Sequence, residues 1–233
     1  MTPFNDPIYS TLPDALVNPQ EVLMAIPCHD RRCDCGTINS ALNVLPHLAR
    51  NPFFIIGNSD ICLTRNIIAH KFMEHSPYEW LVMVDSDIIF SVDDWMYLWE
   101  GSEEIVTAPY ARKIMGEQPV KFGLGFTRVH RSAFEKIKNQ LDPHQMELAQ
   151  RFYQLGEQMV NYYPIGVTMG ADYHGEDRGF FLLSKLSGCS LRLEERTRLK
   201  HVGSFEYGYP DQCQDRGIPI TGAKTFAAED GAN

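Results

Sequence analysis

The chain has 233 residues, of which 44% are hydrophobic and 22% charged, so it can bury a sizeable core, and wholesale disorder is excluded. Its 21 lysines and arginines face 30 acidic residues, a net charge of −9 that argues against diffuse binding of nucleic-acid phosphates and suits binding of a divalent cation. Residues 1–20 lack the pattern of a signal peptide and no apolar run could span a bilayer, so we expect a cytoplasmic protein with no membrane span.

Strands and helices are predicted in alternation along the first half of the chain. Short apolar runs predict buried strands, and polar residues able to cap a backbone N–H predict helix starts. In chain order the predicted elements are a strand over 21–27, a helix over 37–48, a strand over 53–56, a helix over 61–75 capped by Ser59 or Asp60, a strand over 80–84, a helix from Ser91 to near Gly101 and a strand over 104–108. The run WLVMV at 80–84 lacks alternation, which is typical of a central parallel strand buried on both faces.

The second half is predicted to contain more loops, over 116–126 and 162–172. In chain order its other predicted elements are a helix from Ser132 to near Leu141, a longer helix from Pro143 to about Val160, a helix over 178–186 preceded by Glu176 and Asp177, and a strand over 191–193. The alternation predicts an α/β fold with a mostly parallel central sheet. We expect one domain over 21–203, between a lead-in over 1–20 and a tail over 204–233.

Polar clusters follow two of the predicted strands at their carboxyl ends, where α/β sheets bind ligands. CHDRR follows the first strand, and Asp85-Ser86-Asp87 follows WLVMV. In extended backbone, residues two apart project to the same side, so Asp85 and Asp87 would offer hard oxygen ligands to Mn²⁺ or Mg²⁺. Such a cation would also bind diphosphate oxygens. A bare D-x-D triplet is equally an ordinary turn at a strand end, and that alternative stays open.

The order of the remaining motifs resembles that of nucleotide-sugar-dependent glycosyltransferases of the GT-A fold, DxD-containing and family 2-like. The strand ending in DSD is followed by GLGFTRVHRSAFEKI and by HGEDRGFFLLSKLSGCSLRLEERTRLKHVG, which holds an E-D pair and a late histidine. The segment LTRNIIAHKFMEHSPYEWLVMVDSDIIF resembles the R-N helix that precedes D-x-D in several branches. The resemblance covers about 21–203 and implies a single-domain, Rossmann-like GT-A fold. It also implies sugar transfer from a nucleotide-diphosphate sugar, with UDP as the default, to an acceptor hydroxyl.

The resemblance implies a role for each matching residue on the donor side. Asp87 would bind the metal directly, Asp85 would contact the ribose or bind the metal through water, and His201 would be the third protein ligand. The residues implied to contact the nucleotide are Pro27, Cys28, His29, Asp30, Arg65, Asn66, Asp85 and Ser86. The alternatives are an ordinary surface histidine at His201 and a solvated helix charge at Arg65.

On the acceptor side the resemblance implies that Asp177, with Glu176 beside it, is the general base. We expect the helix dipole to keep this carboxylate ionised, which also weakens it as a base. One in-line attack would then invert the anomeric centre, although some related branches retain configuration. Plain N-capping by the E-D pair is the alternative. The residues implied to line the sugar or acceptor pocket are Gly123, Gly125 and Phe126, and an anionic acceptor would contact Lys113 and a basic strip at Arg128, His130 and Arg131.

Two other function classes remain open from the sequence. One is a nucleotidyltransferase or other metal-dependent phosphate-handling enzyme, and the other is a non-catalytic nucleotide-sugar-binding module. A zinc site at Cys28, Cys33 and Cys35 is disfavoured because the spacing lacks paired C-x₂-C motifs. The acceptor can be a glycan, a protein, a small molecule or a modified DNA base, and the sequence predicts no oligomeric state.

Overall fold

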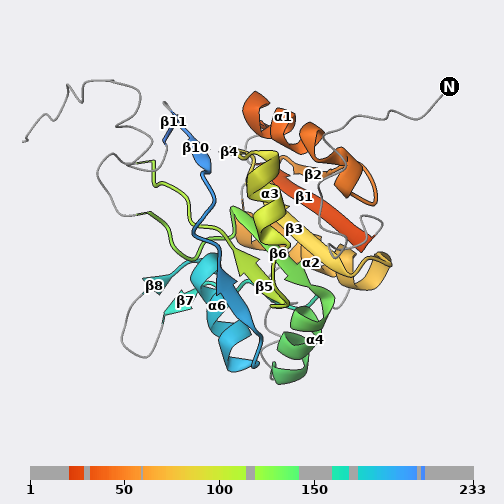
Figure 1. The fold of residues 1–233 in the computed structure, drawn as a ribbon. Coiled ribbons are helices and arrows are strands. Elements are labelled where there is room, and N and C mark those ends of the chain that lie inside the picture. The colour runs from red at the N-terminus through yellow and green to blue at the C-terminus, as the bar shows by residue number, and fades with distance from the viewer. Residues whose placement is uncertain are drawn as a thin grey trace, which may run out of the picture.

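The computed structural model describes residues 21–28, 32–58, 60–113, 119–141, 159–167, 173–203 and 206–207. Its centre is a six-stranded sheet in the order β2-β1-β3-β6-β5-β9 (Figure 1). The strands are β1 (Val22–Cys28), β2 (Phe53–Ile56), β3 (Trp80–Val84), β5 (Ile105–Thr107), β6 (Phe126–His130) and β9 (Leu191–Leu193). Only β6 among these six runs antiparallel to its neighbours. The predicted α/β fold with a mostly parallel central sheet flanked by helices is therefore confirmed.

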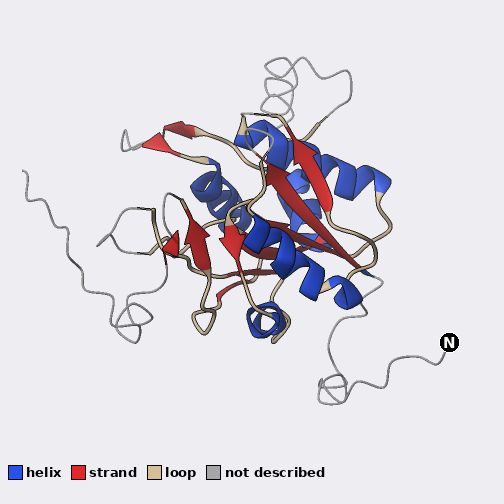
Figure 2. Ribbon diagram, turned by 90° about the horizontal axis from the view of Figure 1, so that it is seen from above, coloured by secondary structure: helices blue, strands red, loops and turns tan. Residues whose placement is uncertain are grey.

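Helices cover both faces of this sheet (Figure 2). Their bounds are α1 (Cys35–Asn43), α2 (Ile61–His75), α3 (Val92–Leu98), α4 (Arg131–Gln140) and α6 (Glu176–Leu186), with a short 3₁₀ helix η4 (Leu45–His47). Helices α1 and α3 pack with Val82 and Val84 of β3 in one apolar cluster, and α2, α4 and α6 pack with Leu81 and Met83 in another. Strand β3 is thus buried on both faces, as its unbroken apolar run predicts.

Short strands outside the central sheet bring distant parts of the chain together. A three-stranded sheet has the order β11-β10-β4, with β4 (Ile88–Ile89), β10 (Lys200–Val202) and β11 (Glu206–Tyr207). Strands β7 (Gly166–Val167) and β8 (Tyr173–His174) form a separate antiparallel pair. None of these pairings was predicted, because strands this short depend on partners that are distant in the sequence. The predicted lead-in over 1–20 and the helix from Pro143 lie outside the described residues, except that residues 159 and 160 are not helical.

Strand β6 was not predicted: it begins at Phe126, where the predicted loop over 116–126 ends, and it lies inside the sheet between β3 and β5. Its apolar pattern is interrupted by Thr127 and Arg128, which are nevertheless buried. The Thr127 hydroxyl donates to Thr107 Oγ1 at 2.9 Å, and Arg128 Nε donates to the Leu98 carbonyl at the end of α3. The guanidinium also stacks on two tryptophan rings. Because these polar groups have hydrogen-bond partners inside the protein, a strand that contains Thr127 and Arg128 is stable in the core.

The predicted basic strip is part of the scaffold. Arg131 donates to main-chain carbonyls at and beyond the end of α2, including those of Phe72 and Ser76. The His130 ring accepts from the Ser132 N–H at 3.2 Å and caps α4, so this helix begins one residue before the predicted Ser132 cap. With Arg128 buried against the end of α3 as well, all three side chains of the strip hold helix ends in place.

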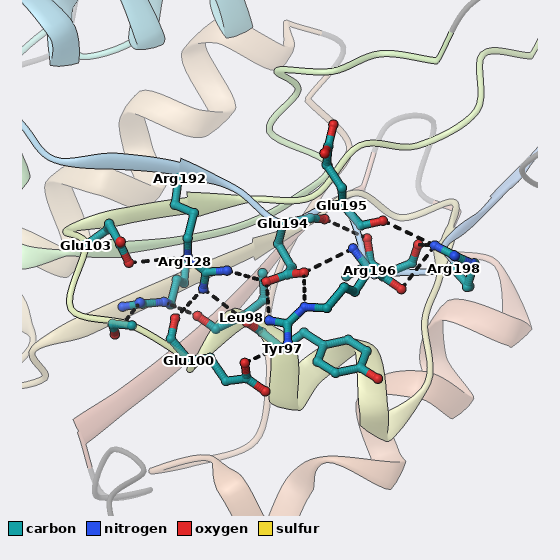
Figure 3. Close-up of polar contacts among 12 residues, drawn as sticks. Tyr97, Leu98, Glu100, Glu103, Arg128, Arg192, Glu194, Glu195, Arg196 and Arg198 are labelled. Carbon is teal, nitrogen blue, oxygen red and sulfur yellow. Dashed lines mark hydrogen bonds and ion pairs between the residues drawn. The ribbon is translucent and has the colours of Figure 1, made fainter.

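Charged residues from β9 and the following turn form a network against the end of α3 (Figure 3). Glu194 is almost fully buried and pairs with both Arg192 and Arg196, with Arg196 Nη2 2.7 Å from its Oε2. Burial alone would raise the pKa of Glu194, but hydrogen bonds from the two arginines lower it to about 2. Arg192 and Arg196 reach on to Glu103 and Glu100. These charges are paired with one another, so the network ties β9 to α3.

Candidate functional site

The carboxyl edge of the central sheet brings together the segments that hold most of the predicted site. The Asp85 N–H, just past β3, donates to the Gly125 carbonyl just before β6 at 2.9 Å. The Ile88 N–H donates back to the Asp85 carbonyl at 3.1 Å, which closes a turn over residues 85–88. The extended backbone assumed for D-x-D is therefore wrong. Because of the turn, Asp85 and Asp87 make ion pairs with different neighbours.

Asp85 belongs to a carboxylate–arginine cluster made of Arg65, Asp85, Glu176 and Asp177. The guanidinium comes from α2, whose start is capped by Asp60 as predicted. Arg65 Nη2 lies 2.9 Å from Asp85 Oδ1 and 3.8 Å from Asp177 Oδ1, and Nε lies 3.6 Å from Glu176 Oε1. The Arg65 side chain is only 2% exposed, whereas that of Asp177 is 28% exposed. One buried cation thus faces three carboxylates, two of them from the first turn of α6.

The electrostatic environment makes Asp177 an unusual carboxylate. Burial, together with the negative charges of Glu176 and Asp85, raises its pKa to about 7, although Arg65 and the Leu124 N–H act in the opposite direction. The expectation that the start of the helix would keep Asp177 a weak base is wrong, because burial and the neighbouring carboxylates raise its pKa. Asp177 Oδ1 is also a buried atom with no hydrogen-bond partner among the described residues. A carboxylate of this kind can accept a proton near neutral pH.

Asp87 and His201 form a second pair, 114 positions apart in the sequence. Strand β10 pairs with β4 so that His201 lies opposite Ile88, and the Val202 N–H donates to the Asp87 carbonyl at 2.7 Å. His201 Nε2 then lies 3.4 Å from Asp87 Oδ1. Partial burial would raise the pKa of Asp87, but His201 and Lys113 keep it below its ordinary value.

The donor set of this pair fits a divalent cation. His201 Nδ1 lies 2.8 Å from the Ala111 carbonyl, which can only accept, so this nitrogen carries a proton and Nε2 is the ring nitrogen that would bind a metal. Two ligands at adjacent corners of an octahedral cation lie about 3 Å apart, close to the 3.4 Å between Nε2 and Asp87 Oδ1. No group of three metal-ligating side chains occurs within the part of the chain described. Further ligands would have to come from substrate or water.

Tyr110 lies between the two halves of the site and was missed by the sequence analysis. Its ring packs edge-on against His201 with the centroids 5.2 Å apart. Burial and the carboxylates of Asp85 and Asp177 raise its pKa well above the ordinary value, so the phenol stays protonated. Its position just past the predicted strand over 104–108 was the available signal, but nothing in the local pattern distinguishes it from a core tyrosine.

The glycines predicted to line the pocket are required by Tyr110. A Cβ atom on Gly123 would lie 2.4 Å from the Tyr110 hydroxyl oxygen. One on Gly125 would lie 2.9 Å from the Tyr110 ring and 3.0 Å from Asp85 Oδ2. Gly125 therefore borders the carboxylate–arginine cluster at Asp85, whereas Gly123 leaves room for the Tyr110 hydroxyl. Phe126 is fully buried in β6 and packs on Phe90 rather than facing the site.

Some residues predicted to contact the nucleotide are buried, and others lie outside the described residues. The side chains of Pro27 and Cys28 are buried at the end of β1, while His29 and Asp30 lie outside the described residues. Asn66 is buried, and its amide oxygen accepts from the Tyr162 N–H at 2.9 Å. The amide nitrogen of Asn66 donates to Asn161 at 2.8 Å, so this side chain anchors the segment that leads to α6.

Two further predicted residues lie at the edge of the site. The Ser86 carbonyl accepts from the Asp34 N–H at 2.7 Å and so joins the D-x-D turn to the start of α1. Lys113, predicted to contact sugar or acceptor, makes an ion pair through Nζ with Asp87 Oδ2. Its side chain is 42% exposed.

Some solved structures are remotely similar to this chain. No model of a known protein family matches the sequence, and no curated protein sequence matches it. Among solved structures, A197 from STIV aligns over 78% of this chain and 86% of its own, with 14% identity and a TM-score of 0.48. At this level of similarity no functional role of any residue is inferred from the alignment.

Two other solved structures are similar at a lower level. One is a glycosyltransferase involved in glycosylation of the major capsid of PBCV-1, with 14% identity over 57% of this chain and 75% of that chain and a TM-score of 0.34. The other, assigned as a glucose-1-phosphate thymidylyltransferase of Bacillus anthracis, has 11% identity over 76% and 69%, with a TM-score of 0.34. No described helix is long and apolar enough to cross a membrane.

Proposed function

We propose that this protein is a metal-dependent glycosyltransferase that moves a sugar from a nucleotide-diphosphate sugar, in the first instance a UDP-sugar, to an acceptor hydroxyl. The observation that carries the proposal is the position of Asp177. It opens α6 beside Asp85 at the carboxyl end of the central strand, and its pKa of about 7 is matched to proton transfer at neutral pH. The Asp87–His201 pair lies on the other side of Tyr110, where a diphosphate would need a cation.

Asp177 would act as the general base. In this mechanism the acceptor hydroxyl donates its proton to an Asp177 carboxylate oxygen while the hydroxyl oxygen attacks the anomeric carbon. The bond from that carbon to the diphosphate breaks on the opposite side, so the configuration inverts. Arg65 holds Asp177, Glu176 and Asp85 in a fixed relation, because its guanidinium is buried and pairs with all three.

The remaining residues would bind the donor. Asp87 and His201 would hold Mn²⁺ or Mg²⁺, which would balance charge on the leaving diphosphate. The Ala111 carbonyl supports this role because it keeps the proton on Nδ1 of His201. Asp85 Oδ2 faces the glycine backbone at Gly125 and would accept from a ribose hydroxyl, while Oδ1 stays on Arg65.

The test is release of nucleoside diphosphate from a panel of nucleotide sugars with Mn²⁺ and mixed acceptors. The Asp177→Asn variant should lose about 10²- to 10⁴-fold of the turnover, the usual contribution of a general base. Asp93→Asn is the matched control, since Asp93 is an exposed acid in the first turn of α3. This variant should keep wild-type turnover.

Three results would contradict the proposal. Full turnover by Asp177→Asn would reject this residue as the base. Release of pyrophosphate from a nucleoside triphosphate and a sugar phosphate would identify a nucleotidyltransferase instead. Donor binding without turnover over the whole acceptor panel would identify a non-catalytic binding module.

A further inference from the structure

The Asp87 carboxylate is occupied on both oxygens by side chains from two different segments. His201 Nε2 lies 3.4 Å from Oδ1, and the Lys113 ammonium contacts Oδ2. The Lys113 and Asp87 side chains are 42% and 31% exposed. An ion pair this exposed contributes little to stability, on the order of 0–1 kcal/mol, so it can open at low cost.

The backbone that carries Lys113 is held against His201 itself. Tyr110 and Val120 exchange both main-chain hydrogen bonds, at 3.2 and 2.9 Å. The next residue, Ala111, accepts from His201 Nδ1 at 2.8 Å, and the Tyr110 ring packs on the imidazole. Lys113 follows two positions later. When its ammonium leaves Asp87, this anchored segment keeps it close to the same pair.

We propose that Lys113 is an exchangeable counter-cation of Asp87: a divalent cation displaces its ammonium from the carboxylate, and the ammonium then pairs with the donor diphosphate. The second half of this inference rests on the proposed function, whereas the first does not. The charges account for both halves. A divalent cation repels the ammonium from Asp87, and the charge that develops on the diphosphate as it leaves the sugar exceeds what one divalent cation neutralises.

The first half is tested by Mn²⁺ binding to the full chain without nucleotide, measured by electron paramagnetic resonance of free Mn²⁺. Lys113→Met removes the competing ammonium and should tighten Mn²⁺ binding by about fivefold. Lys113→Arg keeps the charge and should bind like the wild type. Lys121→Met is the matched control, because it removes the same charge from an exposed lysine on the returning arm of the Tyr110–Val120 bridge. It should change the affinity far less.

The second half is tested by calorimetric titration of UDP at saturating Mn²⁺. Lys113→Met should weaken UDP binding by about tenfold, the loss of one charge-assisted hydrogen bond, whereas Lys121→Met should not. Unchanged or weaker Mn²⁺ binding by Lys113→Met, relative to Lys121→Met, overturns the displacement, as does absence of Mn²⁺ binding in the wild type. Unchanged UDP binding overturns the diphosphate contact.

The failure of this inference differs from the failure of the proposed function. Tighter Mn²⁺ binding by Lys113→Met without any donor turnover by the wild type supports the displacement and rejects the glycosyltransferase. Donor turnover that depends on Asp177, combined with Mn²⁺ affinity indifferent to Lys113, leaves the glycosyltransferase in place and rejects the displacement.

Discussion

Arg65 is the single buried cation of the carboxylate–arginine cluster, and replacing it by methionine is the sharpest perturbation of the site. Methionine approximates the aliphatic stem of arginine but removes the charge that faces Asp85, Glu176 and Asp177. We expect the carboxyl group of Asp177 to become harder to ionise, because Arg65 is the main influence that opposes its desolvation.

The size of the effect follows from the geometry. Arg65 Nη2 lies 3.8 Å from Asp177 Oδ1. Two unit charges at that separation interact by about 4 kcal/mol at an effective dielectric constant of about 20. Halving this for the solvent access of Asp177 leaves about 2 kcal/mol, or about 1.5 pKa units. The pKa of Asp177 should therefore move from about 7 in the wild type to roughly 8.5 in Arg65→Met.

The assay is the pH dependence of kcat/KM for nucleoside diphosphate release. A general base acts only when deprotonated, so activity should rise with pH through the pKa of Asp177. The midpoint of this rise should lie near 7 in the wild type and more than one pH unit higher in Arg65→Met. A ¹³C NMR titration of the aspartate carboxyl groups provides the same midpoint without turnover. A midpoint that stays in place or moves to lower pH would refute the reasoning.

Stability has to be followed in the same experiment. Removing one partner of a buried charge cluster costs about 3–5 kcal/mol, so Arg65→Met should melt at a lower temperature. Arg65→Lys is the second variant, since it keeps the positive charge and loses the planar fork. Its midpoint should stay near that of the wild type, which separates the effect of charge from that of altered packing.

The remaining predictions concern stability. The pKa of Asp177 is raised in the folded state, so its contribution to stability is present below about pH 4 and is lost as pH rises to about 7. Asp177→Asn should therefore gain in melting temperature over the wild type between these pH values, with a constant difference above them, and a flat difference would contradict the assigned pKa. Gly179→Ala would place a Cβ 2.0 Å from the Pro164 carbonyl oxygen and should cost about 1–3 kcal/mol in urea unfolding. Gly175→Ala, whose Cβ meets nothing within 4 Å, should cost about 1 kcal/mol or less, and equal losses would reject the packing argument. Arg128→Met should lower the melting temperature without changing turnover, because Arg128 caps α3 away from the site; lost turnover in a folded variant would refute this.

The parts of the fold with strong local signals were predictable. The strands over 53–56, 80–84 and 191–193 and the helix over 61–75 agree with β2, β3, β9 and α2 residue for residue. The Ser91–Asp94 capping box also occurs as predicted. In each case the pattern acts over a few neighbouring residues, through side-chain periodicity or a cap on the first turn.

The parts that depend on distant partners were not predictable from local pattern. Strand β6 is hidden because Thr127 and Arg128 are buried polar residues whose partners come from other elements. The two-residue strand β4 is stable because β10 pairs with it from more than a hundred positions away.

In the candidate site, too, features with a local signal were predictable and features that depend on distant residues were not. The sequence predicted that Asp85 and Asp87 follow a buried strand. It did not predict the turn between them, because that turn is closed by a main-chain hydrogen bond that no side-chain pattern indicates. The raised pKa of Asp177 is a property of burial and of two neighbouring carboxylates, so the local rule for a helix start predicted the opposite direction. The place of His201 beside Asp87 was implied by family resemblance and not by spacing.

The most direct test of the account is anomalous diffraction from crystals soaked with Mn²⁺ and a UDP-sugar. The account predicts one manganese peak about 2.1 Å from an Asp87 oxygen and from His201 Nε2. Both phosphates of the nucleotide should be bound on its open side, with the anomeric carbon facing Asp177. A manganese ion bound elsewhere, or a nucleotide sugar whose anomeric carbon lies on the far side of Tyr110 from Asp177, would contradict it.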